Sequence, residues 1–395
     1  MTLNVARLSG DAWPCLRHLP TRVMTATAPA QGVGLKRTIK WLLNIVFVLL
    51  INNVFKGQTV VDSVRQCSDS VSKEAILADV YFQQLLTDMK SWSEPPVVIL
   101  LNSYAVNMTL NWLCNTAAMD GVHSSTIIVA MDDESKRALL TQWPKLRIVQ
   151  FKTPCLQETF KPGDATYLTF FLFRTNLIRA LLTADRAFWM LQADTFWREN
   201  LLNLRLDLTY NSSDVLLDQQ GFDGTSELRR GQMNGANFLV NPTKQSVALF
   251  DRLAWFQTNV YVTDADAIKV MCHDTLEYDC QFIPYRYVSG WEWIYGEQSD
   301  PPYCIQMDGE TEGGKAETMA KYNMWFLHDN ASCNSTAVEQ ARVLMDRGHI
   351  PRLYSSSKMK QKFLLGLGQM LTSIPLFGTF YMQYGGIPSM YLQFF

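Results

Sequence analysis

The sequence has few charged residues and almost no net charge. Of its 395 residues, 18% are charged, and the formal net charge is −2. This balance argues against nucleic acid or an anionic membrane surface as the main partner, since both require a basic excess. The low charge accompanies 48% hydrophobic residues, which excludes general disorder. The length fits one large domain or two modest ones.

The sequence also lacks a tight C-x-x-C pair. Cys272 and His273, with Cys280 and Cys304, are too widely spaced for an ordinary zinc motif, so a zinc site is disfavoured. Seven cysteines follow residue 55. In an oxidising compartment some of them should form disulfides, and the odd number leaves at least one free or bridged to another chain. Their connectivity cannot be deduced from the sequence.

Residues 38–55 form the longest apolar run in the N-terminal part of the chain. A membrane-spanning helix needs roughly 17–25 apolar residues, so we expect a transmembrane signal anchor here; the alternative is a buried core helix. Lys36, Arg37 and Lys40 flank its start. The positive-inside rule then places residues 1–37 in the cytoplasm as a tail and the rest of the chain in the lumen.

Four N-x-[ST] sequons support the lumenal side, because all of them follow the expected anchor. They are the candidate glycosylation sites Asn107, Asn211, Asn330 and Asn334. The sequence therefore predicts a single-pass type II protein with its main domain in the lumen.

Two segments flank the expected main domain. Residues 56–94 are predicted to be a lumenal stem, whose amphipathic helix carries Leu77, Tyr81, Leu85 and Met89 at four-residue spacing. Residues 336–395 are predicted to be helical at first and then an uncharged hydrophobic tail. We expect this tail to pack on the domain or lie in the membrane interface rather than to span the membrane.

Short apolar runs alternate with helical periodicity from residue 96 onward, and no internal repeat is evident. This alternation predicts βαβ units on a mostly parallel sheet flanked by helices, within one α/β domain over residues 95–335. The expected strands are 96–102, 125–131, 146–151, 186–191, 214–217 and 236–240, and the longer helices are 107–119, 134–143, 164–183 and 242–258.

Polar residues follow several of these strands, at the edge where open parallel sheets bind ligands. They are Asn102, Asp132, Gln192, Asp194 and Asp218. Asp194 is the most important of them, because a carboxylate at a strand end can hold a divalent cation that bridges a diphosphate. The alternative is that Asp194 caps a turn.

Several segments of the chain resemble segments of the nucleotide-diphospho-sugar transferase family, whose members are GT-A-like type II membrane glycosyltransferases. They follow one another along the chain in the same order as in that family. The segment ADRAFWMLQADTFWRENLL resembles the region around the D-x-D element of that family. The other similar segments begin with VVILLN, STIIVAMDDES, YLTFFLFRTNLI, GQMNGANFLV, DCQFIPYRYVSGWEW and PPYCIQMDGETEGGK. The resemblance covers about residues 95–335. It implies a GT-A-like fold and a Golgi-membrane enzyme that moves a sugar from a nucleotide sugar, UDP-sugar favoured, to a glycan or glycoprotein acceptor.

The resemblance also implies roles for individual residues. On the donor side, Arg174 would pair with the diphosphate, Tyr167 would stack on the base, and Asn234 and Asn237 would bind the sugar, with Asn102, Asp132 and Gln192 nearby. On the acceptor side, Asp264 or Asp266 would act as general base, and Asp218, Trp291 and Trp293 would contact the acceptor. Asp194 and Asp308 would hold a divalent cation, Mn²⁺ in preference to Mg²⁺. Each residue also has an ordinary alternative role, as a helix cap, a turn residue, an ion-pair partner or part of the core.

The chain departs from the family pattern in one important place. The first acid of the D-x-D element is Gln192, so Asp194 is the one charged ligand there. An alternative function therefore stays open: a catalytically inactive lumenal protein of the same fold that binds glycans or a partner enzyme.

Overall fold

The computed structural model describes residues 31–219, 233–272, 277–307, 314–353 and 373–391, with a few residues between 359 and 371. It divides into two compact units at Ile51/Asn52. The long helix α1 (Gln31–Cys67) runs through this boundary, and all of the strands belong to the second unit.

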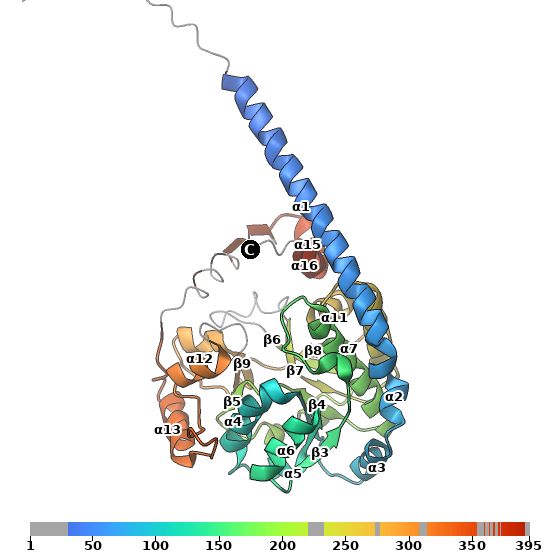
Figure 1. Cartoon of the computed structure of the whole chain (residues 1–395). Coiled ribbons are helices and arrows are strands. Elements are labelled where there is room, and N and C mark those ends of the chain that lie inside the picture. Colours follow the sequence, from blue (N-terminus) through green and yellow to red (C-terminus); the bar gives the residue numbers. More distant parts are fainter. Residues whose placement is uncertain are drawn as a thin grey trace, which may run out of the picture. The chain divides into compact units, whose positions relative to one another are not determined.

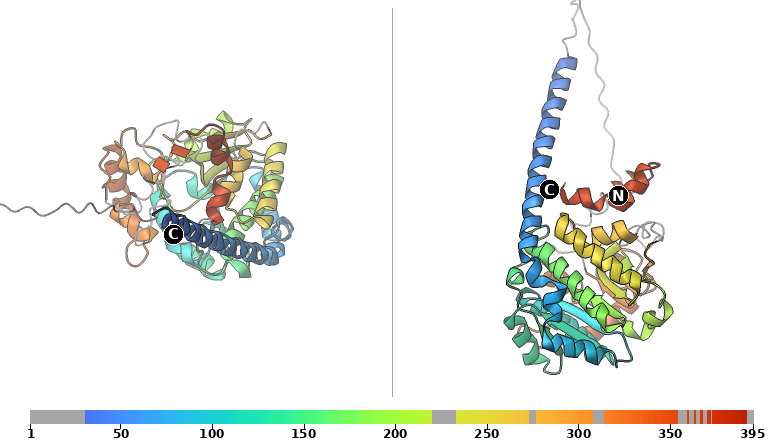
Figure 2. Two further views of the ribbon diagram at one scale, coloured as in Figure 1. Left: turned by 90° about the horizontal axis from the view of Figure 1, so that it is seen from above. Right: turned by 90° about the vertical axis from the view of Figure 1, so that its right-hand side faces the viewer.

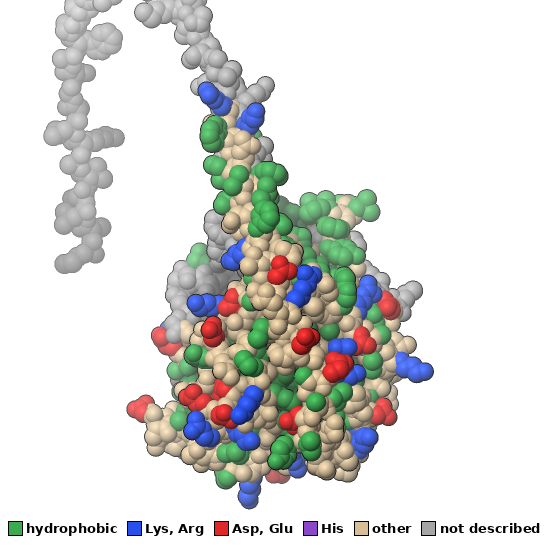
Figure 3. Space-filling view, turned by 45° about the vertical axis from the view of Figure 1, so that its right-hand side comes forward, with side chains coloured by type: hydrophobic (Ala, Val, Ile, Leu, Met, Phe, Trp, Pro, Cys, Tyr) green, Lys and Arg blue, Asp and Glu red, His purple; other side chains and the backbone are tan. Residues whose placement is uncertain are grey.

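The expected anchor at residues 38–55 lies within α1. Large apolar side chains such as Ile39, Trp41 and Phe47 are exposed along this helix, and Figure 3 shows hydrophobic groups on its surface. Among the helices in the described ranges, none combines the length and the apolar character that crossing a membrane requires. The transmembrane span therefore stays a prediction.

A mixed sheet of seven strands forms the centre of the second unit (Figure 1). Its order is β3-β2-β1-β4-β7-β6-β8. Strands β1, β2, β3 and β4 are parallel, as expected, whereas β7 is antiparallel to both β4 and β6. The strands are β1 (Val97–Leu101), β2 (Thr126–Ala130), β3 (Arg147–Gln150), β4 (Phe188–Leu191), β6 (Val215–Gln219), β7 (Met233–Val240) and β8 (Cys280–Phe282).

A second sheet has three short strands in the order β5-β10-β9. These are β5 (Thr195–Trp197), β9 (Val288–Gly290) and β10 (Cys304–Gln306). Strand β5 follows β4 after three residues, so one turn joins the two sheets. The sequence analysis identified neither this sheet nor β8, because three residues are too few to show a periodic pattern.

Helices cover both faces of the main sheet. The main ones are α4 (Val106–Thr116), α6 (Asp133–Gln142), α7 (Ala165–Leu181), α10 (Lys244–Asn259) and α11 (Asp264–Cys272). The others are α2 (Lys73–Leu77), α3 (Val80–Met89), α5 (Val122–Ser125), α8 (Leu206–Thr209), α12 (Lys315–Lys321), α13 (Ser335–Asp346), α15 (Phe377–Tyr384) and α16 (Gly386–Tyr391). Asp164 caps α7, as the sequence predicted, by accepting from the Tyr167 backbone N–H.

Alternate residues of the strands pack into two separate hydrophobic cores. Val98, Met190 and Phe238 face one core together with α7 and α10, which lie side by side (Figure 2). Ile99 and Leu191 face the other core together with α4 and α6. Because successive residues of a strand point to opposite faces, these apolar runs require cover on both sides. A third core lies around the small sheet and includes Phe196, Trp291 and Ile305.

The expected stem packs as part of the second unit. Its helix is interrupted at Asp79, which caps α3. Phe82, Leu85, Leu86 and Met89 form the buried face of α3. The prediction placed Tyr81 on that face, but Tyr81 is 83% exposed, because the helix restarts at Val80 and its apolar face is displaced by one residue.

Three disulfides form among the described residues. Cys67–Cys155 and Cys114–Cys333 join distant parts of the chain, whereas Cys272–Cys280 closes a short local loop. Cys304 is buried and free, and its burial raises the pKa of its thiol. The odd cysteine expected from the sequence is therefore a core residue of β10.

The C-terminal tail packs against the second unit at several described residues. Asn53 donates a hydrogen bond of 2.8 Å to the Tyr391 carbonyl, and the rings of Tyr261 and Tyr391 meet edge to face. Gln383 donates to the Val270 carbonyl of α11 at 3.3 Å. This supports the expectation of a tail packed on the domain.

Neighbouring residues of α3 provide a matched stability test. Phe82 is fully buried against Phe151, so Phe82→Ala should lower the free energy of unfolding by about 3–5 kcal/mol. The exposed neighbour Tyr81→Ala should change it by less than about 0.5 kcal/mol. Denaturant unfolding of the full chain measures both, and equal effects would show that α3 does not dock as described.

Candidate active site

Five polar residues of the main sheet meet at one edge. Gln192 and Asp194 follow β4, and Asp218 lies near the end of β6. Asn234 and Asn237 lie near the start of β7, which reaches the same edge because β7 is antiparallel to its neighbours. The structure thus brings together residues that the sequence analysis named for different reasons.

Gln306, at the end of β10, is the centre of this group. Its side-chain oxygen accepts from Asn237 Nδ2 at 2.7 Å, and its Nε2 donates to Asp194 Oδ1 at 3.0 Å and to Gln192 Oε1 at 3.4 Å. Gln306 is almost fully buried. The sequence analysis did not select it, because the strand that carries it was not recognised.

Asp218 orders the start of β7. Its carboxylate accepts from the backbone N–H groups of Ala236 at 3.2 Å and Asn237 at 2.9 Å, and from Asn237 Nδ2 at 3.0 Å. Asn237 Oδ1 in turn accepts from the Gln192 backbone N–H at 3.2 Å. Buried polar groups linked in this way hold one geometry, since breaking any contact leaves a desolvated partner.

Asp194 is 5% exposed and accepts from the ammonium of Lys315, the first residue of α12. Burial opposes ionisation of this carboxyl, but the charge of Lys315 and the hydrogen bonds from Lys315 and Gln306 outweigh it and lower the pKa of Asp194. Lys315 was missed as a site residue. Its sequence distance from Asp194 gave no signal that the two would meet.

The expected divalent-cation site lies only partly within the described residues. In the part of the chain that the structure covers, no three His, Cys, Asp or Glu side chains are grouped to hold a metal ion. Lys315 and Gln306 take the oxygens of Asp194. Asp308, the second expected ligand, lies outside the described residues. The Mn²⁺ site expected at Asp194 and Asp308 therefore stays a prediction.

Arg174 and Asp264 form a buried ion pair, and both side chains are 4% exposed. Arg174 also donates to the Gly235 carbonyl at 2.6 Å, and Asp264 Oδ1 accepts from the Ala265 N–H at 2.8 Å. Burial raises the pKa of Asp264 despite the neighbouring guanidinium. The pair joins α7, α11 and the start of β7, so the expected diphosphate and base roles find no support in these contacts.

Gly235 lies where this ion pair meets β7. Its φ is +70°, and a Cβ here would come within 3.0 Å of Ala265 Cβ. Glycine adopts this conformation at no steric cost and leaves room for α11. Asp266, the other candidate base, is half-buried and accepts from the Thr263 hydroxyl at 2.8 Å. The Asp266 backbone N–H donates to Thr263 Oγ1 at 3.3 Å, so Thr263 caps the start of α11.

Three expected donor-site residues make local contacts instead. Asn102 donates to the carbonyls of Leu156 and Glu158, each at 3.2 Å. Asp132 caps α6 through the Ser135 N–H and also accepts from the Ser103 N–H, both at 2.7 Å. The ring of Tyr167 packs edge to face on Phe171 at 4.5 Å. Their binding roles stay predictions.

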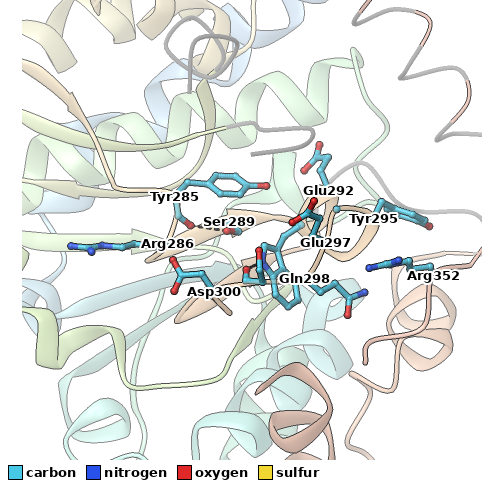
Figure 4. Close-up of a pocket in the computed structure, with 12 residues that line it drawn as sticks. Tyr285, Arg286, Ser289, Glu292, Tyr295, Glu297, Gln298, Asp300 and Arg352 are labelled. Atoms are coloured by element: carbon cyan, nitrogen blue, oxygen red, sulfur yellow. Dashed lines mark hydrogen bonds between the residues drawn. The ribbon is translucent and has the colours of Figure 1, made fainter. Parts of the chain in front are cut away.

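A cavity of about 830 Å³ lies beside the small sheet, where the acceptor was expected (Figure 4). Trp293 lines it, whereas Trp291 is buried in the third core and does not. Figure 4 shows the carboxylate of Glu297 between the rings of Tyr285 and Tyr295. The cavity wall includes Ser289 of β9, which pairs with β10, so the cavity adjoins the strand that carries Gln306.

The four sequons lie in different surroundings. Asn107, Asn211 and Asn330 are exposed, whereas Asn334 is half-buried and caps α13 by accepting from the Ala337 N–H at 3.0 Å. Glycosylation at each of them stays a prediction.

Fold and site together describe an α/β domain with a polar cluster at the carboxyl edge of its parallel strands. The family model for nucleotide-diphospho-sugar transferases matches residues 121–319, about half of the chain. The chain belongs to this family, and its enzyme class is glycosyltransferase.

Three of the solved structures to which this chain is similar are glycosyltransferases by name. The bifunctional glycosyltransferase WbbM is 13% identical over 64% of this chain, with a TM-score of 0.39, and the match spans 50% of that protein. Mouse xyloside xylosyltransferase 1 is 9% identical over 54% of this chain and 97% of its own, with a TM-score of 0.40. Galactosyltransferase LgtC is 12% identical over 67% of this chain and 99% of its own, with a TM-score of 0.39. No curated protein sequence matches the chain significantly.

Asp194→Asn tests the ion pair of the site. The pKa of Asp194 is lower in the folded protein than the ordinary aspartate pKa of about 3.9. Ionised Asp194 therefore stabilises the protein at pH values above about 3.9, and this stabilisation is lost as the pH falls through the pKa of the folded state. At pH 7 we expect the variant to lose about 1–3 kcal/mol of unfolding free energy, a value moderated by the partial exposure of Lys315.

Denaturant unfolding at pH 7 and near pH 3 measures the difference in unfolding free energy between Asp194→Asn and the wild type. This difference should be smaller at the lower pH. Asp133→Asn is the control, because Asp133 pairs with Lys152 on the surface and its loss should lower the free energy of unfolding far less. An equal, pH-independent cost for the two variants would contradict a buried ion pair at Asp194.

Proposed function

We propose that the chain transfers a sugar from a nucleotide diphosphate sugar, UDP-sugar favoured, to a glycan or glycoprotein acceptor. The observation that carries this proposal is the hydrogen-bonded cluster of Gln192, Asp194, Asp218, Asn237 and Gln306. It lies where open α/β sheets bind their ligands. Its amides and carboxylates are suited to binding sugar hydroxyls, which both donate and accept hydrogen bonds.

The cavity beside β9 supports a place for the acceptor. Its aromatic side chains offer flat apolar faces for sugar rings, and its carboxylates and guanidinium groups bind hydroxyls. Tyr285, Trp293 and Glu297 combine these features. Trp293 is the expected acceptor-site residue that this arrangement favours, ahead of Trp291.

A panel of nucleotide sugars tests the proposed reaction on the full chain. With Mn²⁺ present, we expect slow hydrolysis of one donor in the absence of an acceptor. Asp218→Asn should lower this rate at least about 10-fold, because the start of β7 loses the charge that orders it.

Asp207→Asn is the matched control, since Asp207 pairs with Arg205 away from the cluster, and its rate should equal that of the wild type. Nucleotide binding without turnover would favour the inactive, glycan-binding alternative. An absence of nucleotide binding would contradict both.

We also propose that the protein lies in the Golgi membrane as a type II protein with its main domain in the lumen. Three disulfides support an oxidising compartment. The exposed sequon residues Asn107, Asn211 and Asn330 support access by the glycosylation machinery. The basic flank of residues 38–55 supports the orientation.

Expression in cells tests this topology. Endoglycosidase treatment should lower the apparent mass of the protein. Asn107→Gln, Asn211→Gln and Asn330→Gln should each reduce this mass difference by the mass of one glycan. The domain should also resist protease in sealed microsomes. A digested domain with no glycan would contradict the lumenal assignment.

A further inference from the structure

The C-terminal tail exposes apolar side chains that the candidate site does not use. Residues 363–395 contain no charged side chain. Among the described residues of the tail, Leu376 is 90% exposed and Phe363 is 71% exposed. Further exposed large apolar side chains are Met359, Leu367, Met370, Ile374, Phe377, Phe380 and Tyr384. We call this set the tail surface. Apolar side chains gathered in this way on one segment mark a contact with a protein, a ligand or a membrane.

Helix α15 carries the aromatic part of the tail surface on one face. Phe377, Phe380 and Tyr384 follow the i, i+3, i+7 spacing of such a face. The rings of Phe380 and Tyr384 lie against each other, with centroids 5.2 Å apart. Gln383 instead donates to the Val270 carbonyl of α11 at 3.3 Å. The helix is therefore attached to the domain while its aromatic face stays exposed.

Helix α16 meets α1 at the end of the expected membrane anchor. Asn53 of α1 donates to the Tyr391 carbonyl at 2.8 Å. Gly57 leaves room for the Tyr391 ring, because a Cβ on Gly57 would lie 2.8 Å from a ring carbon. The expected anchor, residues 38–55, thus ends between the two residues of α1 that hold the tail. A tail attached at this point is placed at the bilayer surface when the anchor is in the bilayer.

We propose that the tail surface lies in the interface of the membrane that the anchor crosses, as a second attachment of the domain. This inference rests on the proposed membrane location. Lipid is the occupant that the attachment beside the anchor favours, because the bilayer is the surface next to that point of the chain. Aromatic side chains are enriched at the level of the lipid head groups, and a segment without charge brings no ionised group into that layer.

The tail surface fits the membrane interface rather than a second span. Helix α15 has 8 residues, or about 12 Å of helix, whereas the hydrocarbon core of a bilayer is about 30 Å thick. A turn over residues 373–376 precedes it, and Leu376 in this turn has a φ of +65°. Irregular backbone exposed to lipid does not occur in the hydrocarbon region, because its polar groups find no partner there. In the interface, water and head groups satisfy them.

The second attachment also connects the membrane to the candidate site. Helices α15 and α16 pack on α11 (Figure 1). The start of α11 lies against the start of β7, since Ala265 contacts Gly235. Asp264 of α11 pairs with Arg174 at the same place. A domain held by one helix can turn about that helix, whereas a second contact removes this freedom. The tail therefore sets the orientation of the candidate site relative to the membrane.

Fluorescent probes on the full chain in phosphatidylcholine nanodiscs test the inference. Phe380→Cys, Ile45→Cys in the expected anchor and Tyr81→Cys each carry an NBD group in a Cys15→Ser background. The parent without an added cysteine should take up no dye, because Cys304 is buried. A lipid nitroxide near the head group should quench the Phe380→Cys probe at least about 2-fold more than one deep in the acyl chain. Tyr81 is 83% exposed outside the tail, and neither nitroxide should quench its probe.

The probes at Phe380 and Ile45 separate the inference from the proposed membrane location. Lipid quenching at Ile45 without quenching at Phe380 would overturn the inference and leave the location standing. Quenching at Phe380 alone would support the tail contact and contradict the anchor, and no quenching at either would contradict both. Stronger quenching at Phe380 by the deep nitroxide would overturn the interfacial placement. A Phe380 probe shielded from water but not quenched by lipid would indicate a second protein chain and overturn the inference.

Charged variants assign the contact to the tail surface. Leu376→Asp with Phe380→Asp places ionised carboxylates in the proposed interface, and it should lower lipid quenching of a Tyr384→Cys probe by at least about half. Leu208→Asp with Val343→Asp is the matched control, because these side chains are 60% and 43% exposed on α8 and α13. It should leave the quenching unchanged. Thermal melting checks that each variant folds. Unchanged quenching in the folded tail variant would overturn the inference.

Discussion

The side-chain amide of Gln306 is the contact on which the site depends. It carries both an acceptor and a donor, so one buried group binds Asn237 of β7 and Asp194 from the turn between β4 and β5. These residues come from the two sheets, and the amide therefore fixes one sheet against the other. Asn237 extends the link to Asp218 of β6. A hydrophobic contact at this place would join the sheets without specifying the direction of any polar group.

Two buried carboxylates show how the same fold uses charge in different ways. Asp264 and Arg174 are both enclosed, and such a pair contributes little net stability but strongly penalises the loss of either partner. It holds α7, α11 and β7 together. Asp194 is enclosed while its partner Lys315 is partly in solvent. The two pairs therefore differ in exposure, because the Arg174–Asp264 pair is enclosed on both sides, whereas the Lys315 side chain of the second pair is 35% exposed.

The sequence predicted the parts of this fold that depend on long, regular patterns. Short buried runs rich in β-branched residues, such as 97–101 and 126–130, are typical of strands covered on both faces, and the helix cap at Asp164 follows from local chemistry. The rule that ligands bind at the carboxyl ends of parallel strands also identified Asp194 and Asp218. It missed Gln306 and Lys315, because β10 is too short to show a pattern and the two contacts join segments more than a hundred residues apart in the chain. Tyr81 was misplaced because a helix cap at Asp79 displaced the buried face.

The small sheet links the polar cluster to the cavity that we propose for the acceptor. Gln306 lies opposite Gly290 in the parallel pairing of β10 with β9, and Ser289 of the cavity wall lies opposite Ile305. The distance from the polar cluster to the cavity is therefore set by backbone hydrogen bonds rather than by a loose connection. Orientation of two reactants by a rigid frame is a large part of catalysis in transfer reactions. The cavity carries both carboxylates and guanidinium groups, and hydroxyl groups satisfy both kinds of partner, so its lining is consistent with the neutral, hydroxyl-rich acceptor that we propose.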